Sequence, residues 1–297
     1  MVDESRRHRL RRSRLYLPGN SPRLIQVTDV FAPDCFILDL EDAVTPSEKD
    51  AARLLVRNAL MKLDFKSAER VVRINPLTTP FGMDDLKIFS KEAYPDAVIL
   101  PKAEKAEDVK ALHHLLEEIE KKEGISEPIL IMPLIETPLG VQRAYEIATA
   151  SERVCALTFG AEDYTAAIGG KRTREGEELL FARSCIVQAA KAAEVQALDT
   201  IYPDIDDLDG LFRESKKAAE LGFDGKGAIH PKQIESIHKA FMPSSEEVEW
   251  AKRVIDAIEE AKVKGSGVAS VGRKMIDRPV ELKARSILKR GGFSPAH

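Results

Sequence analysis

The segment ILIMPLIETPLG (residues 129–140) combines an apolar run with a single carboxylate, Glu136, which stands between isoleucine and threonine. A parallel strand that is buried on both faces reads as a continuous apolar run and has no use for a charge. A similar pattern recurs in VCALTFGAEDY (residues 154–164), where an apolar run ends in Glu162 and Asp163. Both segments therefore predict buried strands whose carboxyl ends carry acidic side chains, and the purpose of those acids has to be explained.

Short apolar runs of this kind recur along most of the chain, and they alternate with amphipathic segments of helical period. Besides the two segments above, the runs are RLYLPG (14–19), DCFILDLED (34–42), RVVRIN (70–75), AVILPK (97–102), VQALDTIYPD (195–204) and GKGAIHP (225–231). Eight strands alternating with helices predict an α/β protein with a (β/α)8 TIM barrel over residues 14–242. An open doubly wound sheet is the alternative, but LPGNSPRL after the first run lacks the GxGxxG phosphate loop.

Two of the helical segments carry recognisable end signals. Ser47 is a candidate N-cap for the helix that follows it, and Gly124 is a suitable residue to end the helix over residues 107–123.

Bulk composition restricts the class of protein and of partner. A chain of 297 residues can bury one large core, and 43% hydrophobic with 32% charged residues is an ordinary composition for a globular enzyme. The net charge of −4 argues against nucleic acid or a membrane surface as the main partner, and no window approaches 18 consecutive apolar residues. The three cysteines, Cys35, Cys155 and Cys185, lack metal-type spacing, so we expect buried thiols in a reducing, cytoplasmic compartment.

Both ends of the chain lie outside the predicted barrel. Residues 1–13 form a basic arm, and the run RRHRLRRSRL (6–15) holds six arginines. We expect this arm to be solvated; the alternative is that Arg14 reaches an anionic ligand. Residues 243–297 contain a long helix over 244–264, a break at Gly265 and Gly267, and a second helix with Asp277 as candidate N-cap. A barrel does not require this extension, which could pack on its own barrel or lie across a neighbouring subunit.

Catalytic groups of such barrels sit on the loops that follow the carboxyl ends of the strands, and the unusual polar residues of this chain occur there. They are Asp39, Glu41, Asp42, Arg73, Asn75, Lys102, Glu136, Glu162, Asp163, Tyr202, Asp204 and His230. Acids that converge in one mouth repel each other unless a cation neutralises them. Mg²⁺ needs only one or two protein carboxylates, and Glu136 and Asp163 on adjacent strands are the natural pair. Zinc is disfavoured because His230 is the single histidine at a strand end.

Each of these residues also has a purely structural interpretation. An acid at a strand end can cap the following helix, which applies to Asp39, Asp42 and Glu162. Arg73 can hold a substrate carboxylate in a bidentate pair or can form a structural salt bridge. His230 can be a catalytic group or a hydrogen-bonded residue of the rim. The residues alone therefore predict a magnesium-assisted reaction on a small carboxylate.

Taken together, these motifs resemble the citrate lyase β-subunit family, within the wider group of malyl-CoA and citramalyl-CoA lyases. The matching motifs are RSRLYLPGN, ILDLEDAV, VVRINP, VILPKAE, IMPLIETPLG, LTFGAEDY, ELLFARS, LGFDGKGAIHPKQI and KMIDRPV. They follow the family's order from Arg12 to Leu288, which is nearly the whole chain.

The resemblance implies a magnesium-dependent lyase that cleaves a 3-hydroxy-3-carboxyalkyl thioester into an acetyl thioester and a 2-oxo acid, by a retro-Claisen or retro-aldol mechanism. It implies that Glu136 and Asp163 hold Mg²⁺ and that Arg73 holds the substrate carboxylate. Asp277 would be an acid/base residue delivered to a neighbouring subunit's site within a homotrimer or dimer of trimers.

The resemblance also assigns the residues that contact the rest of the substrate. Gly160 and Ala161 would contact it at the site, and Arg14 with the loop Ile229, His230 and Pro231 would surround the nucleotide end of coenzyme A.

Three activities remain open within this group. Citrate lyase β subunits act on an acyl-carrier-protein thioester inside a three-subunit complex, and they tend to carry asparagine where this chain has His230. The histidine favours a free-standing enzyme for malyl-, citramalyl- or citryl-CoA, whereas ELLFARS and ALDTIYPD stay close to citrate lyase. A class II pyruvate aldolase on the same barrel is the third alternative. We expect no catalytic serine or cysteine, because the chain has no GxSxG motif and no cysteine stands beside a histidine in the sequence.

Overall fold

The computed structural model describes residues 3–26, 28, 30–263, 269–271 and 274–292. Its internal contacts divide the chain into two compact units, Met1–His238 and Lys239–His297. This division lies four residues before the boundary that we expected at 242/243.

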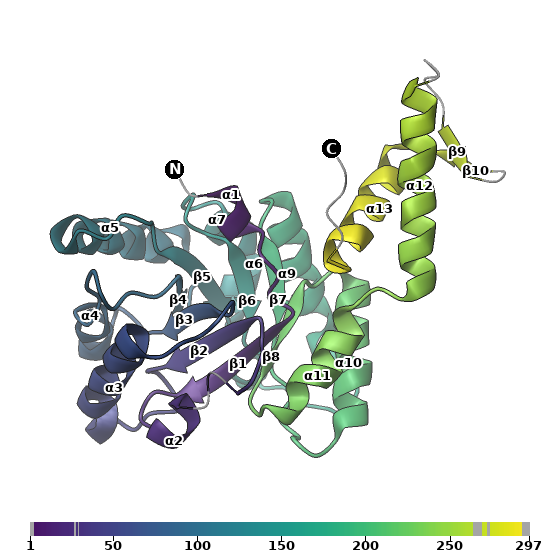
Figure 1. The fold of residues 1–297 in the computed structure, drawn as a ribbon. Coiled ribbons are helices and arrows are strands. Elements are labelled where there is room, and N and C mark those ends of the chain that lie inside the picture. Colours follow the sequence, from purple (N-terminus) through teal and green to yellow (C-terminus); the bar gives the residue numbers. More distant parts are fainter. Residues whose placement is uncertain (1–2, 27, 29, 264–268, 272–273, 293–297) are drawn as a thin grey trace. The chain divides into compact units, whose positions relative to one another are not determined.

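The first unit is a closed barrel of eight parallel strands surrounded by helices, which confirms the predicted TIM barrel (Figure 1). The strands are β1 (Ser13–Pro18), β2 (Cys35–Asp39), β3 (Glu69–Arg73), β4 (Ala97–Leu100), β5 (Leu130–Ile135), β6 (Ala156–Phe159), β7 (Gln196–Asp199) and β8 (Gly225–Ala228). The barrel closes where β8 pairs with β1, with Lys226 opposite Ser13. Because all strands are parallel, their carboxyl ends meet at one mouth, as the sequence pattern required.

Helices and short 3₁₀ turns connect the strands of the barrel, and one helix lies at each end of this series. They are α1 (Glu4–Arg7), α2 (Pro22–Ile25), η1 (Pro46–Glu48), α3 (Lys49–Lys62), α4 (Pro80–Leu86), α5 (Ala106–Glu123), α6 (Pro138–Gln142), α7 (Ala144–Ala148), α8 (Ala161–Ala167), η2 (Glu177–Leu179), α9 (Leu180–Ala192), α10 (Leu208–Leu221) and α11 (Lys232–Phe241). Gly124 ends α5 with φ 69°, as predicted. The predicted N-cap at Ser47 is wrong: Pro46 starts a 3₁₀ turn one residue earlier, and Ser47 lies inside that turn.

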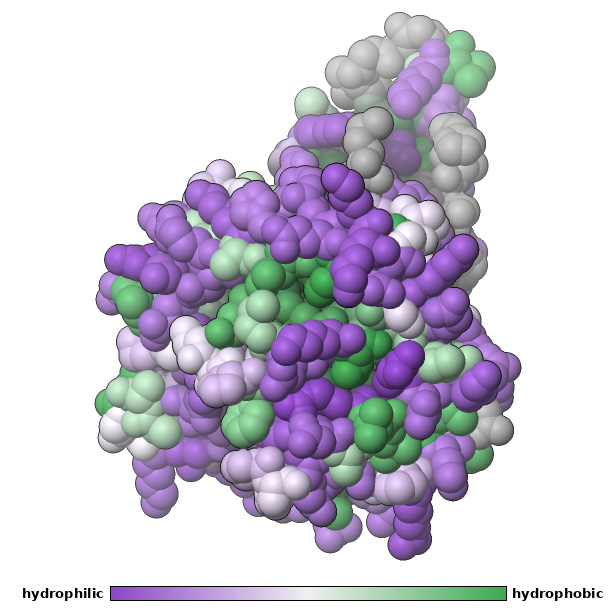
Figure 2. Space-filling view, turned by 90° about the vertical axis from the view of Figure 1, so that its left-hand side faces the viewer, coloured by the Kyte–Doolittle hydropathy of each residue, from purple (hydrophilic) through white to green (hydrophobic). Residues whose placement is uncertain are grey.

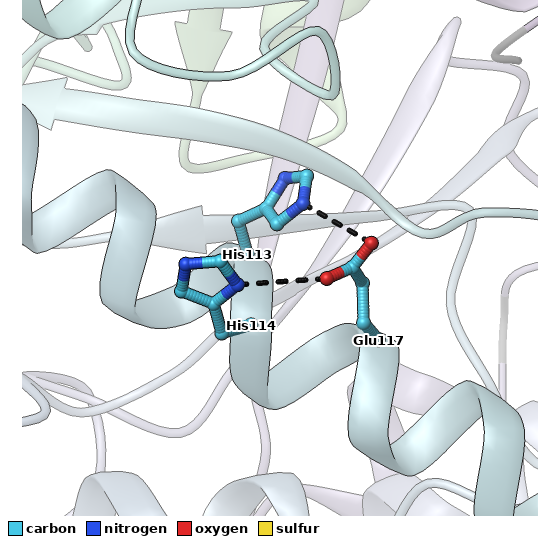
Figure 3. Close-up of side chains that lie close together, drawn as sticks. All are labelled: His113, His114 and Glu117. Atoms are coloured by element: carbon cyan, nitrogen blue, oxygen red, sulfur yellow. Dashed lines mark ion pairs between the residues drawn. The ribbon is translucent and has the colours of Figure 1, made fainter.

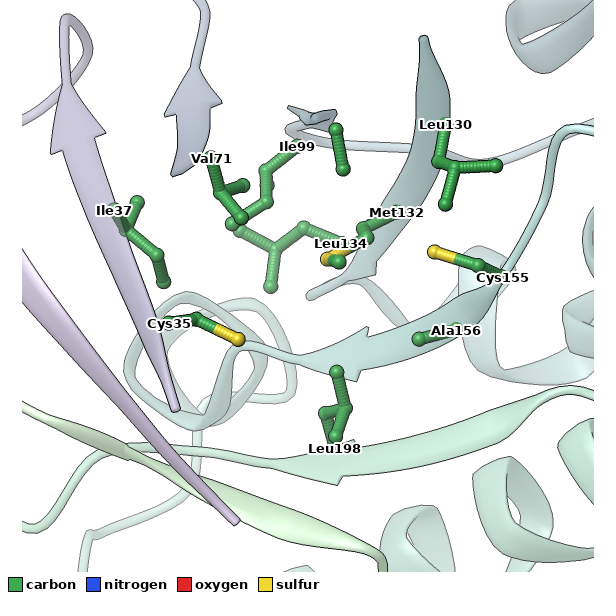
Figure 4. Close-up of a cluster of buried hydrophobic side chains, with 11 residues drawn as sticks. Cys35, Ile37, Val71, Ile99, Leu130, Met132, Leu134, Cys155, Ala156 and Leu198 are labelled. Atoms are coloured by element: carbon green, nitrogen blue, oxygen red, sulfur yellow. The ribbon is translucent and has the colours of Figure 1, made fainter. Parts of the chain in front are cut away.

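The interior of the barrel is a packed apolar core. Figure 4 shows its central cluster, which consists of Cys35, Ile37, Val71, Ala97, Ile99, Leu130, Met132, Leu134, Cys155, Ala156 and Leu198. Cys35 and Cys155 are buried as expected, whereas Cys185 on α9 is half-buried, so the expectation of three buried thiols is wrong at that position.

The N-terminal arm forms part of the barrel's packing. Arg11 is fully buried, and its Nε and Nη2 each donate to the Glu69 carboxylate over 2.7 Å. Arg12 pairs with Asp34 through two hydrogen bonds of 2.8 and 2.9 Å. The expectation of a solvated arm is therefore wrong for these arginines, because their carboxylate partners lie at the amino-terminal ends of β2 and β3.

The second unit is a helical hairpin with a small β-ribbon. It contains α12 (Ser245–Val263), β9 (Ala269–Val271), β10 (Lys274–Ile276) and α13 (Arg278–Arg290). Ala251, Val254, Ile255, Ala284, Ile287 and Leu288 form its own buried cluster. Gly265 and Gly267 lie outside the described residues.

Asp277 caps α13, as predicted, because its Oδ1 accepts from the Val280 backbone N–H over 3.0 Å. None of the helices in the described part of the chain combines the length and apolar character that crossing a bilayer requires.

Candidate active site

A pocket of about 430 Å³ lies inside the carboxyl end of the barrel. Figure 2 shows this side of the barrel, toward which β1 and β2 run in Figure 1: hydrophobic side chains gather in its middle and hydrophilic ones surround them. The sequence-predicted residues that line the pocket are Arg14, Asp39, Asp42, Arg73, Glu136, Gly160, Ala161, Glu162, Asp163 and Ile229. The structure thus brings together residues that come from β1, β2, β3, β5, β6 and β8 or the loops after them.

Glu136 is the buried acid of this pocket. It follows β5 directly, is 4% exposed, and its Oε1 accepts a 2.7 Å hydrogen bond from the Lys102 backbone N–H. Burial, together with the nearby Glu41 and Asp163 carboxylates, raises the pKa of Glu136 to about 8. It does not cap α6, because Thr137 fills that position and accepts from the Gly140 N–H over 3.1 Å. Glu136 is therefore a carboxylate directed into the pocket.

Asp163 lies in the first turn of α8, directly after β6, and about half of its side chain is exposed. The Lys102 Nζ lies 3.8 Å from Asp163 Oδ2, so Lys102 contacts both acids, one through its backbone and one through its side chain. Gly160 lets the chain after β6 pass close to the Glu136 side chain, since a Cβ at that position would lie 2.8 Å from Glu136 Oε2.

Arg73 is held by two carboxylates, that of Asp39 at the end of β2 and that of Glu41 in the loop that follows. Its Nε and Nη2 donate to Asp39 over 2.8 and 2.6 Å, and its Nη1 lies 2.9 Å from Glu41 Oε2. Its guanidinium also lies over the Tyr16 ring, 5.3 Å from the centroid. Asp39 is therefore the partner of an arginine, rather than the helix cap that we considered as an alternative.

Glu41 is an acid whose environment the sequence did not indicate. It is 3% exposed, and burial raises its pKa to about 7 against the opposing effect of Arg73. It lies in the acid-rich run LDLEDA, where a pattern cannot distinguish a buried carboxylate from an exposed one.

Asp42 and Glu162 line the pocket, but their side chains are more exposed than those of Glu136 and Glu41. The Asp42 side chain is 61% exposed and lies 3.8 Å from Arg73, and Glu162 pairs with Arg172 over 3.2 Å. Asp204 accepts from the backbone N–H groups of Asp206 and Asp207, so it organises the loop after β7.

Arg14 lies deeper inside the barrel than a residue of the pocket rim. It is the second residue of β1, is 1% exposed, and its Nη2 donates to the Asp199 carbonyl over 2.6 Å. A side chain buried in this way lines the inner part of the pocket and not the rim where a nucleotide would lie. This burial does not favour the expected contact of Arg14 with the nucleotide end of coenzyme A, and that contact stays a prediction.

The loop after β8 lies at the rim. Ile229 is 40% exposed and lines the pocket. His230 is half-buried, and its Nδ1 accepts from the Lys232 N–H over 3.1 Å at the start of α11, next to the half-buried Pro231. His230 thus has the geometry of the hydrogen-bonded rim residue that we considered as an alternative. Asp277 belongs to the second unit, where it is exposed apart from its bond to Val280, and its catalytic role stays a prediction.

A separate group of potential metal ligands lies on α5. Figure 3 shows the rings of His113 and His114 facing the Glu117 carboxylate, with one nitrogen of each at 3.3 and 3.5 Å from its two oxygens. His113 Nδ1 also lies 2.7 Å from Ser151 Oγ. None of these residues lines the pocket, and the contacts are those of ion pairs on a helix surface.

Known proteins share both the sequence pattern and this fold. The model of the HpcH/HpaI aldolase/citrate lyase family matches residues 12–231. The citrate lyase subunit beta of Leuconostoc mesenteroides subsp. cremoris is 44% identical over 284 residues, which cover 95% of this chain and 93% of that protein. Human mitochondrial citramalyl-CoA lyase is 33% identical over 285 residues, which cover 93% of this chain and 84% of that protein.

Solved structures agree with these relatives. The protein CitE of Mycobacterium tuberculosis, in complex with magnesium, acetoacetate and coenzyme A, is 33% identical with a TM-score of 0.74, covering 96% of this chain and 99% of that chain. A citrate lyase beta subunit from the same organism, complexed with oxaloacetate and magnesium, is 34% identical with a TM-score of 0.65, covering 80% of this chain and 100% of that chain. The chain therefore belongs to the HpcH/HpaI aldolase/citrate lyase family and is a lyase.

Proposed function

We propose that this protein is a magnesium-dependent carbon–carbon lyase that cleaves a 3-hydroxy-3-carboxyalkyl thioester into an acetyl thioester and a 2-oxo acid. The observation that carries the proposal is the meeting of Glu136, Asp163 and Arg73 in one pocket at the carboxyl end of the barrel. Two acids beside an arginine suit a substrate that presents a carboxylate next to a metal-binding hydroxyl group.

The pocket fits a hard divalent cation. Glu136 and Asp163 offer carboxylate oxygens only, and the high pKa of Glu136 reflects burial and like charge without a neutralising cation. Glu136 and Asp163 would hold Mg²⁺, which two structures of related proteins contain. When bound, Mg²⁺ would act as a Lewis acid toward the substrate's hydroxyl and carboxylate oxygens.

Arg73 would bind the carboxylate on the carbinol carbon. Asp39 occupies its Nε and Nη2, so Nη1 is the nitrogen available to a substrate, in exchange for the contact with Glu41. The bidentate pair with Asp39 fixes the guanidinium before substrate arrives, which lowers the entropic cost of binding.

Asp277 would act as the acid/base residue. Cleavage of the carbon–carbon bond requires the carbinol hydroxyl to lose its proton, and it leaves the enolate of the acetyl thioester. Asp277 would accept the hydroxyl proton as a base and then give it, as an acid, to the terminal carbon of the enolate. We propose that Asp277 reaches the pocket of a neighbouring subunit, in a homotrimer or dimer of trimers.

A complementation experiment tests this arrangement. Asp277→Asn and Glu136→Gln proteins should each be inactive, and mixed oligomers should regain activity because some sites combine an intact pocket with an intact Asp277. Mixed oligomers that form but stay inactive would show that Asp277 does not act across subunits.

The whole proposal is tested by turnover. Purified protein is incubated with Mg²⁺ and malyl-, citramalyl- or citryl-CoA, and the released 2-oxo acid is measured. We expect turnover of at least one thioester, loss of activity with EDTA, and recovery with Mg²⁺. Absence of turnover on all three, with or without carrier-protein thioesters, would refute the proposal.

A second candidate is the β subunit of citrate lyase, acting on citryl-acyl-carrier protein within a complex. The 44% identity to a citrate lyase subunit beta favours it over the 33% identity to citramalyl-CoA lyase, whereas His230 favours coenzyme A. Copurification of partner subunits from the native host with an inactive isolated chain would support the complex. A class II pyruvate aldolase is distinguished by measuring coenzyme A affinity, since such an enzyme would have none.

A further inference from the structure

We propose that Arg14 is a specificity-determining residue that binds a second carboxylate, at the far end of the substrate's acid half. The pocket then favours citryl thioesters, which release a dicarboxylic 2-oxo acid, over thioesters that release pyruvate or glyoxylate. This inference rests on the proposed lyase function and adds the class of acid to it.

Arg14 differs from the other buried arginines in having no acidic partner. Within the described ranges, the fully or nearly fully buried arginines are Arg11, Arg14, Arg53, Arg153 and Arg183. The other four form ion pairs with Glu69, Asp85, Glu120 and Asp199, respectively, at 2.6–3.2 Å. Arg14 has a hydrogen bond to a neutral carbonyl, and its Nε and Nη1 are buried without a protein partner in the part of the chain that the structure describes.

The acid whose backbone carbonyl Arg14 contacts is already neutralised. Asp199 offers Arg14 its backbone carbonyl, while its carboxylate binds Arg183 and Lys226 at 2.9 and 2.8 Å. A buried guanidinium without a counter-ion has lost its hydration without compensation, and such groups are retained where a ligand supplies the missing charge. The two unpartnered nitrogens can donate to one carboxylate in the fork geometry that suits this anion.

The depth of Arg14 indicates which part of the substrate it meets. Arg14 is the second residue of β1, whereas Arg73 is the last residue of β3 and Glu136 follows the end of β5. The strand rises about 3.3 Å per residue, so the two arginines lie at different levels of the same pocket. Coenzyme A or a carrier protein cannot enter 430 Å³, and the thioester must therefore leave through the mouth. The acid half of the substrate therefore points inward. One of its carboxylates lies at Arg73, and the carboxylate at its other end lies at Arg14.

The first experiment compares kcat/KM for citryl-, citramalyl- and malyl-CoA in the unmodified protein, Arg14→Met and Arg14→Lys. We expect the unmodified protein to favour citryl-CoA by about 100-fold or more, because a site built for a charged group rejects analogues that lack it. The Arg14→Met substitution should lower kcat/KM for citryl-CoA by about 100-fold and change kcat/KM for citramalyl-CoA by less than about threefold. Arg14→Lys should recover part of the loss on citryl-CoA.

Arg12→Met is the matched control, since Arg12 lies two residues away, pairs with Asp34 and does not line the pocket. It should leave the preference among the three thioesters unchanged. Equal losses on all three thioesters in Arg14→Met, or a wild-type preference for citramalyl-CoA, would overturn the assignment of Arg14. Absence of turnover on every thioester would instead refute the lyase function itself.

Thermal denaturation separates binding from a structural role. Arg14→Met should keep or raise the Tm of the unliganded protein, because it removes a buried charge that has no partner. With Mg²⁺ present, oxaloacetate should raise the Tm of the unmodified protein more than pyruvate does, and Arg14→Met should abolish that difference. A large fall in Tm together with an unchanged order of ligands would show that Arg14 is structural.

Discussion

Asp39 holds Arg73 through two parallel hydrogen bonds of 2.8 and 2.6 Å, from the ends of neighbouring strands β2 and β3. The guanidinium therefore keeps one orientation in the pocket, and the Nη1 that lies 2.9 Å from Glu41 is the part of it that a substrate could take over. A binding group fixed in this way is organised before the ligand arrives.

Arg73→Lys should reduce kcat/KM on the thioester substrate by about 100-fold or more, since lysine cannot reproduce a bidentate pair. Steady-state kinetics measure the loss. Arg70→Lys is the matched control. Arg70 lies on the same strand as Arg73, and outside the pocket it forms a similar pair with Asp96, with hydrogen bonds of 2.9 and 3.3 Å. Equal loss in both variants would mean that the Arg73 effect is structural.

Glu136→Gln and Asp163→Asn should each abolish Mg²⁺ binding and turnover, because both carboxylates are needed to hold the cation beside a neutral substrate hydroxyl. Isothermal titration with Mg²⁺ or Mn²⁺ measures binding apart from activity. Glu162→Gln, at the adjacent position that pairs with Arg172, should keep both properties. Normal metal affinity in Glu136→Gln would contradict the assignment of this site.

The stability of the metal-free protein should depend on pH through Glu41. Its pKa is raised from 4.5 to about 7 by burial, so the folded state binds more protons than the unfolded state between these values. The stability that protonated Glu41 contributes at low pH is therefore lost as pH rises from 4.5 to 7, by no more than about 3 to 4 kcal/mol. Urea denaturation in EDTA should show Glu41→Gln equal to the unmodified protein near pH 4.5 and more stable at pH 8. Asp42→Asn, at an exposed position, should stay within about 0.5 kcal/mol at both pH values. A constant difference between Glu41→Gln and the unmodified protein would refute this reasoning.

Arg11→Met should lower the free energy of unfolding by about 3 to 5 kcal/mol, because it leaves the Glu69 carboxylate buried without its partner. The double variant Arg11→Met/Glu69→Leu should recover much of this loss, since no unpaired charge remains. Arg9→Ala is the control and should cost about 1 kcal/mol or less, because Arg9 is only half-buried and donates to the neutral Ser67 carbonyl. If the double variant instead loses the sum of the free energies that the two single substitutions cost, the broken Arg11–Glu69 ion pair is not the origin of the instability.

The sequence predicted what depends on local pattern. The eight apolar runs gave the barrel because strands buried on both faces leave no alternation, and helices of period 3.6 separate them. Glu136 could be identified as a site residue because a charge that interrupts such a run must lie at the strand's end. The cap at Asp277 and the end of α5 at Gly124 followed in the same way from the residues themselves.

Pairings between distant parts of the chain could not be read from the sequence. Arg11 and Arg14 stand three residues apart in one basic run, yet one is neutralised by Glu69 and the other meets a neutral carbonyl of β7. Likewise, Asp39, Glu41 and Asp42 lie in one acidic run, but the position of Arg73 makes only the first two its close partners and leaves Asp42 largely exposed. Sequence spacing determined that these side chains lie at a barrel mouth or at its opposite end. Closure of β8 against β1 decided which charges meet, because the energy of a charge depends on its burial and on its neighbours in space.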